Sequence, residues 1–169
     1  MPKLLSRFDQ LQSWLQNELS CDAAHLEPAS SDASFRRYYR IQYEHSTFIV
    51  MDAPPPQEDV RPFVRVAGLM QAAGLQTPEI HAVDEERGFL LLGDLGNRSY
   101  FESLTSETVD GLYADALKAL VALQLGVTLD TAGLPSYDEA LLTRELGIFR
   151  EWLLEGMLGM ELADEALRM

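Results

Sequence analysis

A change in residue pattern at Gly93-Asp94-Leu95-Gly96 is the feature that most constrains the fold. Before it lie four short segments with the alternating, β-branched and aromatic composition of strands: 35–43, 48–53, 80–83 and 88–92. One amphipathic segment at 58–73 separates the second and third of them, and after residue 96 only helical spacing occurs. Strands followed by a run of helices predict an α+β fold in two parts rather than a doubly wound parallel sheet.

Local signals refine the N-terminal part. Apolar residues at helical spacing predict a helix over 4–19, and 22–34 is expected to be a loop with one short strand. Glu44-His45-Ser46 is expected to join the first two strands into a hairpin. Gly74 is placed to stop the helix at 58–73.

The C-terminal part is predicted to be helical throughout. Ser106 is expected to cap a helix whose apolar face runs to Leu123. Ser136 and Glu139 form a capping-box pattern before an apolar stripe that includes Trp152, which we expect to be a packing residue. Residues 161–169 also have helical character.

Charge and composition narrow the class of protein. The net charge of −14 and pI of about 4.4 argue against nucleic acid as a partner. The longest apolar runs are too short to cross a membrane, no secretory signal core follows Met1, and a single cysteine agrees with a reducing compartment, so we expect a cytoplasmic protein. Arg36, Arg37 and Arg40 form a local cationic patch that suits an anionic ligand, or that pairs with surface carboxylates.

The segment Ser30–Ser34 is a candidate phosphate-binding loop. Its small residues would let backbone N–H groups face an anion, and the strand that follows brings Arg36 to the same end. The loop has no glycine and matches neither the Walker pattern nor the glycine-rich kinase loop, so a solvated turn is the alternative.

Four motifs in order resemble the aminoglycoside phosphotransferase-like family: Ser31–Tyr38, Met51–Pro55, Gly88–Gly96 and Leu134–Asp138. Within that family the likeness is greatest to the group that phosphorylates the anomeric hydroxyl of N-acetylmuramate or N-acetylglucosamine in cell-wall recycling. The resemblance implies a protein-kinase-like fold, with residues 1–93 as the nucleotide-binding N-lobe and 94–169 as the hinge and first helices of a helical C-lobe. It also implies ATP and Mg²⁺ as cofactors and a small sugar as substrate.

The resemblance assigns nucleotide contacts residue by residue. Ser31, Ala33, Ser34 and Arg36 are expected at the phosphates, and the Gly93 carbonyl and Leu95 amide at adenine, with Leu92 behind the pocket. The position of the kinase strand lysine holds Met51, and no acidic residue lies between Arg61 and Glu79 to pair with it. Either Arg36 or Arg37 replaces the lysine, or backbone and metal hold the phosphates, and Met51 itself is interpreted as a core residue.

The family's catalytic His-x-Asp pattern is not found, because neither His25, His45 nor His81 has an aspartate two residues later. We therefore expect no catalytic or metal-binding residue within this chain, with those segments beyond Met169, and exposed apolar faces on the helices at 107–125 and 136–154. A catalytically inactive module that binds a nucleotide or a partner, or an aminoglycoside kinase, are the alternatives. The oligomeric state is left open.

Overall fold

The structure is a computed structural model that describes residues 5–20, 25–31, 34–128 and 133–160. The chain divides into two compact units, Met1–Thr128 and Leu129–Met169. The predicted helix at 161–169 and the candidate phosphate ligand Ala33 lie outside the described residues.

The first unit is built on a five-stranded antiparallel sheet in the order β1-β2-β3-β5-β4. The strands are β1 (Glu27–Ser31), β2 (Arg37–Tyr43), β3 (Ser46–Asp52), β4 (Ile80–Asp84) and β5 (Phe89–Gly93). The predicted hairpin is confirmed, since Tyr43 pairs with Ser46 across the turn between β2 and β3. The α+β fold class is confirmed as well.

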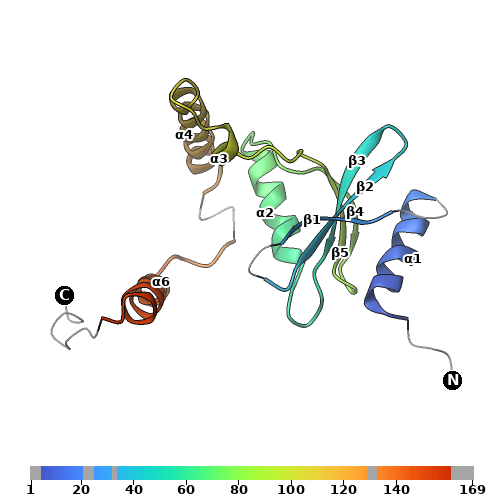
Figure 1. The fold of residues 1–169 in the computed structure, drawn as a ribbon, viewed down its shortest axis with the longest axis horizontal. Coiled ribbons are helices and arrows are strands. Elements are labelled where there is room, and N and C mark those ends of the chain that lie inside the picture. The colour runs from blue at the N-terminus through green and yellow to red at the C-terminus, as the bar shows by residue number, and fades with distance from the viewer. Residues whose placement is uncertain (1–4, 21–24, 32–33, 129–132, 161–169) are drawn as a thin grey trace. The chain divides into compact units, whose positions relative to one another are not determined.

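One helix covers each face of this sheet, as Figure 1 shows for α1 (Arg7–Leu19) and α2 (Arg61–Ala72). Because successive strand side chains point to opposite faces, Val50 packs with α1 whereas its neighbour Met51 packs with α2. The core on the α1 side comprises Leu11, Trp14, Leu15, Ile41, Val50, Phe89 and Leu91. The core on the α2 side comprises Met51, Ala53, Val60, Leu90 and Leu92.

The predicted end of α2 is confirmed, whereas the predicted start of the next long helix is corrected. Gly74 adopts a positive φ of 81° after α2, as predicted. The helix expected to be capped by Ser106 is α4 (Val109–Gly126), and Ser106 instead donates its hydroxyl to Glu107. A one-turn helix α3 (Tyr100–Ser103), closed by a Ser99–Glu102 capping box, precedes it and was not predicted.

The second unit contains α6 (Glu139–Ile148) and its π-helical continuation η1 (Phe149–Met157). The capping box expected at Ser136 is wrong, because Asp138 is the N-cap and accepts the Leu141 N–H at 2.9 Å. A cap two residues later still satisfies a free helix N–H, so the local chemistry was recognised and its position was not.

Apolar faces are exposed on the C-terminal helices, as expected. Leu125 of α4 is 78% exposed, and Trp152 is 75% exposed. Trp152 is therefore not a packing residue in this chain, which corrects the prediction. In the described part of the chain, none of the helices combines the length and apolar character required to cross a membrane.

Candidate functional site

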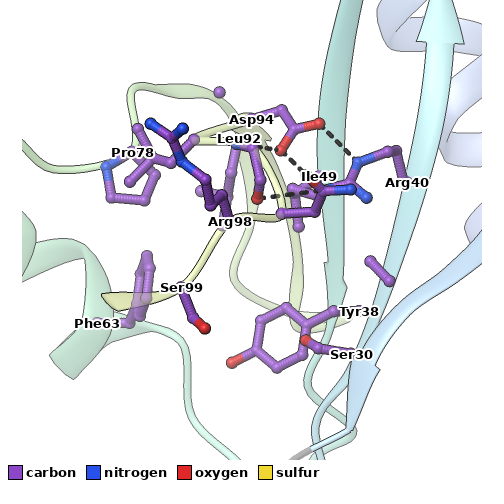
Figure 2. A pocket seen from close by; sticks show the side chains of 15 residues that line it. Ser30, Tyr38, Arg40, Ile49, Phe63, Pro78, Leu92, Asp94, Arg98 and Ser99 are labelled. Carbon is purple, nitrogen blue, oxygen red and sulfur yellow. Dashed lines mark hydrogen bonds and ion pairs between the residues drawn. The ribbon is translucent and has the colours of Figure 1, made fainter. Parts of the chain in front are cut away.

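A pocket of about 460 Å³ opens where the sheet meets the segment that follows β5. Its apolar wall comes from Tyr38 on β2, Ile49 on β3 and Leu92 on β5, and Phe63 of α2 closes one side (Figure 2). The other wall is the chain from Gly93 to Ser99. The pocket is therefore lined by apolar side chains on one side and on the other by residues 93–99, which include the polar side chains of Arg98 and Ser99 (Figure 2). The apolar wall suits a flat heteroaromatic ring.

Asp94 anchors the backbone wall to the sheet. Arg40 of β2 donates to both Asp94 carboxylate oxygens, from Nε at 2.6 Å and from its terminal nitrogen at 3.0 Å. The Gly96 N–H donates to Asp94 Oδ1 at 2.9 Å, and the Gly96 carbonyl accepts from Arg40 at 3.3 Å. This bidentate pair, with the Asp94 side chain only 5% exposed, fixes residues 94–96 against β2.

Two predicted adenine contacts line this pocket. Gly93 and Leu95 both belong to its wall. The Gly93 N–H is already bonded to the Glu79 carbonyl at 2.7 Å. The Leu95 N–H, by contrast, has no acceptor among the described residues, so it is available to a ligand.

Of the predicted phosphate residues, Arg36 lines a second groove that shares Phe63 and Pro78 with the pocket. Arg36 Nε lies 3.1 Å from Ser34 Oγ and 3.7 Å from Glu58 Oε2. Glu58 also accepts the Phe35 N–H at 3.1 Å. The structure thus brings Ser34 and Arg36 together, while Ser31 ends β1.

Glu58 is a residue that sequence reasoning missed. It precedes α2, whereas the search for an acidic partner covered only the stretch after Arg61. The available signal was its position two residues after three consecutive prolines, which end the strand.

Comparison with known proteins decides the class of this chain. Residues 25–168 match the phosphotransferase enzyme family. The chain belongs to that family. It is 50% identical to an N-acetylmuramate/N-acetylglucosamine kinase of Pseudomonas aeruginosa, over 96% of this chain and 50% of that protein.

Two further relatives carry the same name. The protein of Pseudomonas putida is 47% identical over 97% of this chain and 51% of its own length. The protein of Neisseria meningitidis is 32% identical over 94% of this chain and 48% of its own length. The chain spans about half the length of the curated relatives it matches.

Within this phosphotransferase chain, Met51 is a core residue. Its side chain is fully buried opposite Leu90 in the cluster beneath α2. The interpretation of Met51 as packing is confirmed. Arg36 lies before β2, where its Nε is 3.1 Å from Ser34 Oγ and 3.7 Å from Glu58 Oε2.

The Asp94 carboxyl makes the free energy of unfolding depend on pH. The hydrogen bond from Arg40 holds its pKa down at about 2 against the opposing effect of burial, and the Gly96 N–H and Thr47 hydroxyl assist. Because the pKa of Asp94 is lower in the folded state, its ionised form stabilises the fold at pH values above the unfolded-state pKa of about 3.9. This stabilisation is lost as the pH falls toward 2.

We expect Asp94→Asn to cost about 2 kcal/mol of unfolding free energy at neutral pH and progressively less below pH 4. The substitution keeps an oxygen that can accept from Gly96 but removes the charge. Urea unfolding of both proteins at several pH values between 7 and 2 checks this. If the difference in unfolding free energy between the two proteins stays constant from pH 7 to pH 2, the stabilising role of ionised Asp94 is contradicted.

Proposed function

We propose that the complete protein is an ATP-dependent phosphotransferase that phosphorylates the anomeric hydroxyl of N-acetylmuramate or N-acetylglucosamine. The observation that carries the proposal is the pocket beside Asp94, with its apolar wall and a Leu95 N–H that has no acceptor in the part of the chain that the structure describes. The shared name of the relatives supports the choice of an amino sugar over an aminoglycoside. A kinase that draws on ATP is expected in the cytoplasm.

Residues 1–93 act in this proposal as the nucleotide lobe, and 94–169 as the hinge and first part of a helical lobe. Adenine would lie against Tyr38, Ile49 and Leu92 and accept the Leu95 N–H. Its exocyclic amine would donate to the Gly93 carbonyl. A purine contacts such a wall through its face and one edge, so apolar side chains and backbone suffice to hold it.

The phosphates would extend toward the groove that contains Arg36. The guanidinium supplies charge-assisted hydrogen bonds to phosphate oxygens, and Ser34 and Ser31 add hydroxyl donors. Glu58 orients Arg36, as a glutamate orients the lysine in other kinases. Phosphoryl transfer depends on such positioning and electrostatics more than on covalent chemistry by the protein.

Mg²⁺ would neutralise charge on the phosphates during transfer. Among the residues that the structure describes, no group of three or more His, Cys, Asp or Glu is arranged to hold a metal ion. Its ligands in the complete protein therefore stay a prediction, as does the base that accepts the proton of the sugar hydroxyl.

The test is an ADP-release assay on the complete gene product with ATP and each of three acceptors: N-acetylmuramate, N-acetylglucosamine and an aminoglycoside. We expect release with the amino sugars, and a sugar 1-phosphate product by phosphorus NMR. Release with the aminoglycoside alone would favour that alternative. Saturable nucleotide binding without release for any acceptor would favour the inactive binding module.

A further inference from the structure

The hinge carries a charged pair in which both Asp94 carboxylate oxygens accept hydrogen bonds from the protein. Asp94 Oδ2 accepts from Arg40 Nε, and Oδ1 accepts from the Arg40 terminal nitrogen and from the Gly96 N–H. A hydrogen bond from the Thr47 side chain adds a further donor. Asp94 nevertheless belongs to the pocket wall (Figure 2). It directly precedes Leu95, whose N–H has no acceptor among the described residues.

This pair controls the direction of the backbone at Leu95. Gly96 has a φ of 90°, so the chain turns sharply just after Leu95, and the Gly96 N–H is tied back to Asp94. Arg40 then ties Asp94 and the Gly96 carbonyl to β2. With Asp94 and Gly96 both fixed, the Leu95 N–H between them has a defined orientation at low entropic cost.

Purine bases differ in the hydrogen-bond donors and acceptors that they present to a backbone segment such as Gly93–Leu95. Adenine presents a ring nitrogen acceptor beside an amine donor, whereas guanine presents a carbonyl acceptor beside ring and amine N–H donors. A backbone N–H next to a carbonyl matches adenine. Guanine would need a free acceptor for its N–H groups, and an ionised carboxylate is the strongest acceptor available.

We propose that the Arg40–Asp94 ion pair selects adenine over guanine at this hinge, with Arg40 as the positioning residue. Arg40 does so by occupying both Asp94 oxygens, which would otherwise accept guanine N–H groups, and by holding the Leu95 N–H toward adenine. A buried base with unmatched donors is rejected strongly, since each unpaired group keeps its full desolvation cost. The inference rests on the proposed function, because it concerns the nucleotide of that reaction.

The experiment compares ATP with GTP in the complete gene product and in Arg40→Met, Arg40→Lys and Arg87→Met. Arg87→Met is the matched control, because Arg87 forms an equivalent pair with Asp84 at 2.6 Å and does not line the pocket. KM and kcat are measured for each nucleotide at saturating sugar. Equilibrium binding of non-hydrolysable ATP and GTP analogues and the unfolding temperature are measured alongside.

We expect the original protein and Arg87→Met to prefer ATP. In Arg40→Met the ratio of kcat/KM for ATP to that for GTP should fall about tenfold or more, through KM rather than kcat. Arg40→Lys keeps the charge with a less directional donor and should give an intermediate ratio. A purely structural role would lower stability without changing the ratio.

An unchanged ratio in Arg40→Met, or an equal change in Arg87→Met, would overturn the inference. If Arg40→Met does not fold, the ratio in Arg40→Lys decides in the same way. If no amino sugar is phosphorylated with either nucleotide, the proposed function fails. The binding ratio of the two analogues then still decides the role of Arg40, so the two failures are distinguishable.

Discussion

Replacing Arg7 with methionine is expected to lower the free energy of unfolding by about 3 to 4 kcal/mol, because it leaves a buried carboxylate without its charged partner. Asp52 at the end of β3 is only 3% exposed, and Arg7 Nε donates to its Oδ1 at 2.7 Å. Arg7 also donates to the Arg87 carbonyl at 2.6 Å and lies 4.7 Å from the centre of the Phe89 ring. One side chain thereby attaches the start of α1 to two strands.

A double substitution separates the charge from the packing. Arg7→Met combined with Asp52→Asn removes both ions, so we expect it to recover part of the loss seen in Arg7→Met alone. Arg144→Met is the control, because its pair with Glu145 joins exposed side chains and should change stability by less than about 1 kcal/mol. Urea unfolding followed by circular dichroism gives the three values. A loss in Arg7→Met no larger than that of the control would contradict the argument.

Gly88→Ala is expected to cost about 3 kcal/mol, from a strained backbone and a lost hydrogen bond. Gly88 has a φ of 70°, and a Cβ there would lie 2.0 Å from the Ala53 carbonyl oxygen. The same two residues are joined by the Ala53 N–H, which donates to the Gly88 carbonyl at 2.8 Å. The substitution must therefore separate β5 from the end of β3.

Gly74→Ala isolates the contribution of the contact. Gly74 has a φ of 81°, but a Cβ there would meet nothing within 4 Å. Its replacement should cost only the backbone strain, about 1 kcal/mol. Urea unfolding of both variants measures the difference. Equal losses at the two glycines would show that the close approach at Ala53 has no energetic effect.

The fold was largely predictable because its signals are local. Alternation along 48–53 indicated a strand, and helical spacing at 58–73 indicated the helix that became α2. The cap positions at Ser106 and Ser136 were wrong because neighbouring polar side chains accept the free N–H groups instead: Thr105 accepts those of Glu107 and Thr108, and Asp138 accepts that of Leu141. Which of them becomes the cap depends on how the preceding chain arrives, and periodicity does not encode that.

The site was only partly predictable. The pocket wall at Gly93 and Leu95 followed from the change of pattern at the end of β5, together with the resemblance to kinases. The cationic patch was recognised, yet its partners were not: Glu58 for Arg36 and Asp94 for Arg40. Their carboxylates are two of many in a chain of net charge −14, so composition could not single them out.

The sequence by itself determined the class of fold, the order of the strands and the longer helices, and the place where the strand-containing part ends. These follow from backbone propensity and apolar spacing, which act over a few residues. Only the tertiary structure decided that Arg40 meets Asp94, 54 residues away, and that Arg7 meets Asp52, 45 residues away. Such pairs depend on strand register and on the docking of α1, because a shift of one residue would turn each side chain to the opposite face of the sheet.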